Sequence, residues 1–201
     1  MIKALLIDVD GVLIRGRPDD GRPWASALAE DLGFGTEVLQ REFFRPHWED
    51  IVVGRASLHE RLAPVLARIA PDLPVERFVD YWFANDARID KQLIADLDAA
   101  RASGYQAYLA TNQEHARARY LMGDLGLSDH VDGIHYSASL GCRKPDPAFF
   151  RAVEHVLDLP AQNLLLIDDD DRNVAAARTN GWQARQWTGD RRLPDILRAF
   201  A

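Results

Sequence analysis

The chain is poor in cysteine and has no long hydrophobic run. Cys142 is the only cysteine among 201 residues, which excludes an intrachain disulfide and a cysteine-based zinc site. No segment approaches the roughly 20 consecutive apolar residues that a membrane helix needs. We therefore expect a cytoplasmic protein with neither a signal peptide nor a membrane span.

A surplus of positive charge is also missing. The 31 acidic side chains outnumber the 24 lysines and arginines, which gives a net charge of −7 at neutral pH. This balance disfavours nucleic acid and anionic membrane surfaces as partners. Apolar residues make up 47% of the chain and charged residues 27%, as in a globular protein of one domain with a modest insertion. The oligomeric state is open between monomer and homodimer.

Short apolar runs alternate with helix-length stretches over most of the chain. Such alternation predicts a mostly parallel sheet covered by helices on both faces, with right-handed crossovers. The expected fold class is therefore α/β, with a Rossmann-like parallel sheet core. The predicted strands are residues 2–7, 106–110, 134–136, 163–167 and 183–186, and the predicted core helices include residues 114–125, 147–157 and 173–180.

Residues 15–87 break this alternation, because they contain amphipathic helical stretches and no convincing strand. An insertion directly after the first strand would lie over that strand's carboxyl end as a lid. We therefore predict a discontinuous α/β core, residues 1–14 and 88–201, and a helical cap, residues 15–87. Helices are predicted there at residues 24–32, 37–44, 57–69 and 75–84, with Trp24, Trp48 and Trp82 as core residues of the cap.

The first predicted strand ends in two carboxylates, Asp8 and Asp10, followed by Gly11. Ligand sites on open α/β sheets lie beyond the carboxyl ends of their strands. The Asp-x-Asp spacing lets both carboxylates face one crevice, while Gly11 is free to adopt an unusual turn. One carboxylate can then attack a substrate while the other transfers protons.

Three further polar clusters follow the later strands, in the order Thr111 and Asn112, then Lys144, then Asp168 and Asp169. Carboxylates that share one crevice repel by roughly 4 kcal/mol per close pair at an effective dielectric constant of about 20. A divalent cation relieves that repulsion. An all-oxygen site suits Mg²⁺, which commonly shares its coordination shell with a substrate phosphate.

This ordered set of motifs resembles the haloacid dehalogenase-like hydrolase superfamily, over essentially the whole core. The resemblance implies that Asp8 is the nucleophile, which forms an aspartyl-phosphate and also binds Mg²⁺. It implies that Asp10 is the general acid and base and that its main-chain carbonyl joins the metal shell. Thr111 and Asn112 would hold phosphoryl oxygens, and Lys144 would balance the charge on Asp8 and the phosphate.

The acidic run after the fourth strand supplies the rest of the implied metal site. Asp169 matches the most regular metal ligand of the family, and Asp168 either ligates the metal or orients other groups. Asn173 stands where many relatives carry a second aspartate, which implies a water-mediated contact. Asp170 and Asp171 are expected to be loop charges or charges at a helix N-terminus.

The implied function is Mg²⁺-dependent hydrolysis of a small phosphorylated metabolite, similar to a sugar phosphate. Asp10 argues against dehalogenation, because carbon–halogen cleavage needs no protonated leaving group. Arg55 lies in the loop where relatives carry specificity residues and is a candidate substrate contact, although most arginines are simply exposed. Two alternatives stay open, a phosphomutase and a catalytically silent member that binds a ligand or a protein.

Overall fold

Five parallel strands form one sheet in the order β3-β2-β1-β4-β5. The computed structural model describes residues 1–200. The central strand β1 pairs with β2 on one side and with β4 on the other, and every residue of β1 and β4 is buried. The predicted α/β fold class with a parallel sheet is confirmed. The strands are β1 (Ala4–Ile7), β2 (Gln106–Thr111), β3 (Gly133–Tyr136), β4 (Leu164–Asp168) and β5 (Gln183–Gln186).

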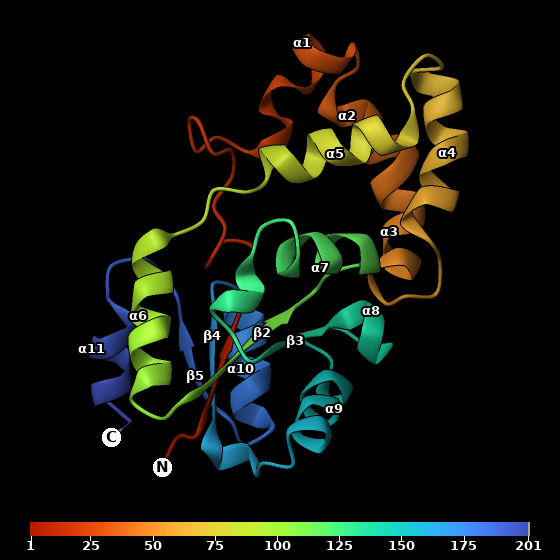
Figure 1. The fold of residues 1–201 in the computed structure, drawn as a ribbon. Helices are drawn as coiled ribbons and strands as arrows, with labels where there is room; N and C mark the ends of the chain where they lie inside the picture. The colour runs from red at the N-terminus through yellow and green to blue at the C-terminus, as the bar shows by residue number, and fades with distance from the viewer. Residues whose placement is uncertain (201) are drawn as a thin grey trace.

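Helices cover both faces of the sheet (Figure 1). Successive residues of a strand point to opposite faces, so Leu5 and Ile7 join one buried cluster while Ala4 and Leu6 join the other. The first cluster packs under α6 (Lys91–Ala102), α7 (His115–Met122) and α11 (Leu193–Arg198), and the second packs under α9 (Pro147–Leu157) and α10 (Asp171–Thr179). A short helix, α8 (Ser137–Leu140), follows β3.

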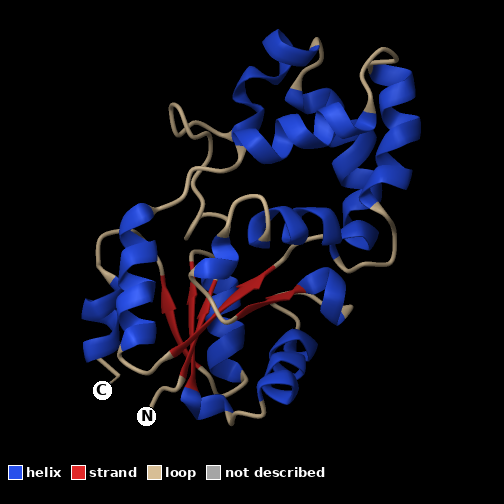
Figure 2. Cartoon of the chain, viewed as in Figure 1, coloured by secondary structure: helices blue, strands red, loops and turns tan. Residues whose placement is uncertain are grey.

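A group of helices, the predicted cap, follows the first strand and packs around a further hydrophobic cluster. Figure 2 shows it as a group of helices above the sheet. The rings of Trp24 and Trp82 stack 5.1 Å apart, and Trp48 lies 5.9 Å from Trp82, so all three pack in the cap as expected. The elements are η1 (Trp24–Ala27), α1 (Leu28–Leu32), α2 (Thr36–Leu39), η2 (Gln40–Phe44), α3 (Arg45–Val52), α4 (Leu58–Ile69) and α5 (Val75–Asn85).

The prediction that a cap helix ends at Phe44 is wrong, because the chain continues as α3 to Val52. Proline has no N–H to donate within a helix, so Pro46 could have interrupted the chain here. The chain instead forms a π-helical turn over η2, directly before Pro46. Pro46 then lies in the first turn of α3, where a missing N–H costs little.

The two linkers between cap and core run side by side. Ile14 forms an antiparallel bridge with Ile89, and Arg15 N donates to Arg88 O over 3.0 Å. The outgoing linker begins just after Asp10, so the position of the cap is tied to the carboxyl end of β1. Within residues 1–200, no helix combines the length and apolarity that crossing a membrane requires.

Candidate active site

Lys144 occupies the centre of the cluster at the carboxyl ends of the strands. Its buried ammonium nitrogen lies 3.1 Å from Asp8 Oδ1 and 2.5 Å from Asp168 Oδ2. The same nitrogen donates to Ala110 O over 2.6 Å. An ammonium group has three N–H donors, so these three contacts fix the cation directly beside Asp8.

Asn112 holds the backbone that carries Lys144. Its amide nitrogen donates to Lys144 O over 2.9 Å, and its amide oxygen accepts from Lys144 N over 2.9 Å. Both polar atoms of the Asn112 side chain are therefore used within the protein. Thr111 is buried at the end of β2, next to this pair.

Asp168 is fully buried, and donors of the protein surround its carboxylate. Asn173 Nδ2 lies 3.1 Å from both oxygens, and Asp170 N donates to Oδ1 over 2.9 Å. Together with Lys144, these contacts account for both oxygens, so Asp168 is well placed to orient Lys144. Asp170 also caps the N-terminus of α10, as expected for a charge at a helix end.

Asp169 projects toward the turn after β1. A Cβ atom on Gly11 would lie 2.2 Å from Asp169 Oδ2, and Gly11 has a φ of +81°. Glycine is therefore required here both for the turn and for the space that the carboxylate fills. Carboxylate oxygens of Asp8, Asp168 and Asp169 all lie within 4.8 Å of one another. Such a set of oxygen donors fits the chemistry of Mg²⁺.

Asp10 accepts a hydrogen bond of 2.5 Å from Gln113 Nε2. Desolvation by the surrounding protein raises the pKa of Asp10, although Arg117 and the Gln113 contact lower it. A carboxyl group with a raised pKa holds its proton more firmly, which favours a role as general acid. The geometry and the direction of the pKa shift both suit proton transfer.

The pKa values of the other site residues reflect burial and crowding. Burial raises the pKa of Asp8 to about 7; the charge of Lys144 opposes this, whereas Asp168 and Asp10 add to it. Burial alone would lower the pKa of Lys144, but Asp8 and Asp168 raise it. Burial and then Asp168 raise the pKa of Asp169. The uncompensated negative charge of this cluster favours a bound cation.

A cleft of about 420 Å³ opens from Asp10 and Asp169 toward the cap. Asp86, on the returning linker, lines it together with Trp24 and Arg15. Burial and the nearby Asp10 raise the pKa of Asp86 to about 6, against the effect of Arg117.

Arg117 joins the core helix α7 to the end of the cap. Its side chain is buried, donates to Phe83 O over 3.1 Å and to Asp86 O, and lies 3.6 Å from the Asp86 carboxylate. The guanidinium also lies over the rings of Phe83 and Tyr120, at 5.2 and 5.3 Å. One side chain thus holds the cap linker against the core.

The cap loop around Gly54 lies against the core. A Cβ atom on Gly54 would lie 2.4 Å from Ala138 O, and Ser137 Oγ donates to Val52 O. Arg55, in this loop, forms an exposed ion pair of 2.8 Å with Asp50 and does not line the cleft above Asp10. Its predicted contact with substrate therefore gains no support from the geometry.

The sequence did not predict a role for three residues of the site: Gln113, Asp86 and Arg117. Gln113 directly follows the Thr111-Asn112 motif, so its position in the sequence was the available signal. Asp86 and Arg117 lie in stretches without a motif and meet only in the folded chain. Nothing in the local sequence distinguishes them from ordinary helix and linker charges.

Comparison with known proteins places the chain in a family. Residues 2–181 match the family described as haloacid dehalogenase-like hydrolase. The chain belongs to this hydrolase family. The resemblance inferred from the four motifs is therefore confirmed.

Individual relatives are similar to this protein over most of its chain. A phosphoglycolate phosphatase of Rhodospirillum rubrum is 30% identical, over 90% of this chain and 77% of that protein. A plasmid phosphoglycolate phosphatase of Cupriavidus necator is 31% identical, over 89% and 77%. A family enzyme of Bacteroides thetaiotaomicron, solved with magnesium and inorganic phosphate, has a TM-score of 0.81 over 98% of this chain and 99% of that one, at 17% identity. This last similarity shows a shared fold.

Proposed function

We propose that the chain is a Mg²⁺-dependent phosphatase that acts on a small phosphorylated metabolite through a phosphorylated Asp8. The observation that carries the proposal is the contact between Lys144 and Asp8 beside the carboxylates of Asp168 and Asp169. A cation and an acidic metal site that flank one carboxylate suit attack on phosphorus.

In the first half of the reaction, a carboxylate oxygen of Asp8 attacks the phosphorus atom. Val9 N donates to Asp8 Oδ1 over 2.8 Å, and Lys144 lies beside the same oxygen. One oxygen is thus anchored, and the carboxylate is held in a fixed orientation. As the ester bond breaks, Asp10 donates its proton to the departing oxygen of the substrate.

In the second half, Asp10 accepts a proton from a water molecule that attacks the phosphorus. The bond between phosphorus and Asp8 breaks, which releases inorganic phosphate and restores the carboxylate. Gln113 keeps the Asp10 side chain in place during both transfers. Thr111 and the backbone at Asn112 supply donors to the phosphoryl oxygens, while the Asn112 side chain keeps Lys144 in position.

Asp8, Asp169 and the Asp10 carbonyl would hold Mg²⁺, with Asp168 at the edge of the shell. When bound, the metal supplies positive charge to the phosphoryl oxygens and offsets the repulsion among the carboxylates. Gly11 leaves room for the Asp169 carboxylate at this position. The fit rests on these donors and on that space.

The cleft suits a compact substrate, and Arg15 is the group in it that would meet an anionic leaving portion. The cleft volume of about 420 Å³ matches a small metabolite. Arg15 is the only positively charged residue among the described residues that line it, beside the aspartates Asp10, Asp86 and Asp169. The Arg15 guanidinium lies over the Trp187 ring at 5.9 Å. 2-Phosphoglycolate, the compound in the names of the relatives, is therefore the first substrate to test, ahead of sugar phosphates.

A phosphatase screen with matched variants tests the proposal. Wild type should release inorganic phosphate from p-nitrophenyl phosphate and from 2-phosphoglycolate in the presence of Mg²⁺. Asp8→Asn should abolish both activities, whereas Asp124→Asn, which removes an exposed acid after α7, should not affect them. Turnover by Asp8→Asn would remove the assigned nucleophile. A sugar phosphate, which carries further free hydroxyls, completes the screen, and its conversion into an isomerised phosphate ester in place of free phosphate would indicate a mutase.

A further inference from the structure

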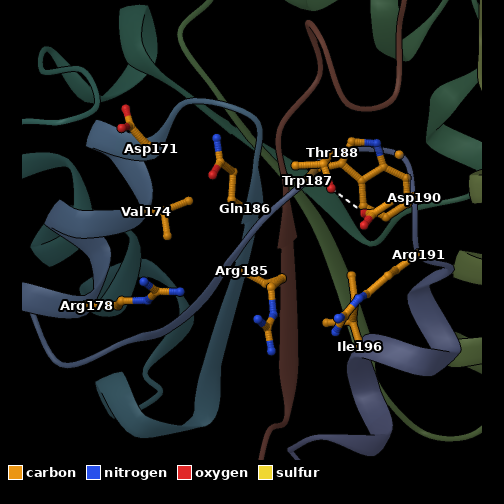
Figure 3. Close-up of a pocket in the computed structure, with 11 residues that line it drawn as sticks. Asp171, Val174, Arg178, Arg185, Gln186, Trp187, Thr188, Asp190, Arg191 and Ile196 are labelled. Atoms are coloured by element: carbon orange, nitrogen blue, oxygen red, sulfur yellow. Dashed lines mark hydrogen bonds between the residues drawn. The ribbon is translucent and has the colours of Figure 1, made fainter.

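A second cavity, of about 360 Å³, lies along the outer edge of β5. Figure 3 shows side chains of α10 on one side of it, Arg185 of β5 in the middle, and residues of the following loop and α11 on the other side. It shares Trp187 and Thr188 with the catalytic cleft. Nothing in the proposed reaction uses this cavity.

The cavity is basic, although the chain as a whole carries a net charge of −7. Arg178, Arg185 and Arg191 line it, against two aspartates. Within residues 1–200, none of these arginines has a carboxylate oxygen within 4.0 Å. Arg178 donates to Ala184 O, which leaves Arg185 and Arg191 available to bind an anion.

Two buried hydrogen-bond donors of this cavity have no acceptor within the described chain: Arg185 Nε and Trp187 Nε1. These residues are two positions apart along an extended segment, so their side chains share one face. Native proteins seldom leave a buried N–H group without a partner. Both nitrogens are nevertheless closed to solvent, so a ligand in the cavity would meet the accessible ends of the Arg185 and Arg191 side chains rather than these two atoms.

The same segment supports the metal-binding loop. Gln186 Nε2 donates to Asp169 O over 2.9 Å, and Trp187 N donates to Asp168 O over 2.9 Å. A ligand in this cavity would therefore touch the residues that hold the backbone of both aspartates. The cavity and the catalytic cleft lie on either side of this short stretch of chain.

We propose that the cavity beside β5 binds a small anion with phosphoryl or carboxylate oxygens. The terminal guanidinium nitrogens of Arg185 supply the central donors, and Arg191 supplies charge at the rim. Arginine suits this role because its planar N–H groups match both kinds of oxyanion. The site is distinct from the catalytic cleft, and its existence does not depend on the proposed phosphatase activity.

Calorimetric titration of the full chain tests this site, after passage over a chelating resin into metal-free buffer so that no Mg²⁺ supports binding in the catalytic cleft. Inorganic phosphate and succinate serve as probes and separate the phosphoryl and carboxylate sources. Wild type should bind at least one of them saturably. Arg185→Gln should weaken binding by about tenfold or more, as expected for the loss of a charge-assisted hydrogen-bonding group.

Three variants complete the design. Arg151→Gln removes an exposed arginine on α9, away from the cavity, and should bind like wild type. Thr111→Val removes a hydroxyl from the catalytic site at the carboxyl end of β2 and should also bind like wild type. If Arg185→Gln fails to fold, Arg191→Gln on the exposed rim should still weaken binding severalfold. The proposal is overturned if wild type binds neither probe, if the Arg185 and Arg191 variants bind like wild type, or if Thr111→Val alone loses binding.

Discussion

The substitution Gly11→Ala tests whether the turn after β1 makes room for the proposed metal ligand. Gly11 has a φ of +81°, and a Cβ atom there would lie 2.2 Å from Asp169 Oδ2. Gly33 is a matched control, because it has the same φ of +81° and nothing within 4 Å of its Cβ position. The two substitutions share the backbone strain and differ only in the collision.

The magnitudes follow from this geometry. An alanine in the left-handed region costs about 1–2 kcal/mol of folding free energy, so both variants should lose at least that much. In Gly11→Ala, the carboxylate must also retreat by about 1.2 Å to reach the 3.4 Å of ordinary contact. Metal sites tolerate deviations of only about 0.2 Å, so we expect the apparent affinity for Mg²⁺ to fall by about 10–100-fold or more.

Two measurements separate the effects. Urea unfolding in EDTA reports the shared strain, and the Mg²⁺ dependence of p-nitrophenyl phosphate hydrolysis reports the displaced ligand. Gly33→Ala should be destabilised with an unchanged Mg²⁺ requirement, while Gly11→Ala should change in both assays. An unchanged Mg²⁺ requirement in Gly11→Ala would refute the placement of Asp169 in the metal site.

Three further outcomes follow from the same site. Lys144→Met leaves buried carboxylates without their cation, so the free energy of unfolding measured in urea should fall by about 3–5 kcal/mol. A fall below about 1 kcal/mol, which is typical of exposed ion pairs, would contradict a buried network. The pKa of Asp86 is raised from 3.8 to about 6, so the folded state binds this proton more tightly and its ionisation costs stability as pH rises. Asp86→Asn should therefore raise the free energy of unfolding at pH 8 by up to about 3 kcal/mol and leave it unchanged below pH 4. Equal effects at both pH values would show that the raised pKa of Asp86 is not the cause. Arg15→Gln should lower kcat/KM for 2-phosphoglycolate about tenfold and leave p-nitrophenyl phosphate unaffected, and a parallel loss on both substrates would argue against recognition of an anionic leaving portion.

The strands and the polar motifs could be predicted because short segments of the sequence are enough to identify them. The apolar run before Asp8 had to be a buried strand, and the predicted strand at residues 183–186 coincides with β5. Asp8, Thr111 and Asp168 stand at strand ends, so the parallel arrangement brings them to one edge, whereas Lys144 follows α8 and reaches that edge from the next loop. Composition and short-range pattern suffice for such features.

The cap linkers and the supports of the site were not predictable in the same way. Gln113 and Asp10 are 103 positions apart, and Arg117 reaches Phe83 across 34 positions. Such contacts depend on how the cap sits on the core, which no local pattern encodes. The same holds for Arg55, whose loop position suggested a substrate contact but whose side chain pairs with Asp50. The division of the chain into a cap of residues 15–87 and a core of the remaining residues stays a prediction.

The register of the sheet explains why one lysine reaches three strands. Ile7 pairs with Leu109 of β2 and with Ile167 of β4, so the next residue of each strand, Asp8, Ala110 and Asp168, lies at one level. These are the three residues that the Lys144 ammonium contacts. A shift of β4 by one residue would remove Asp168 from this level and bring an apolar or a differently directed side chain to Lys144. The pairing that buries the apolar faces therefore also sets the spacing of the charged groups, so the stability of the sheet and the geometry of the site depend on the same register.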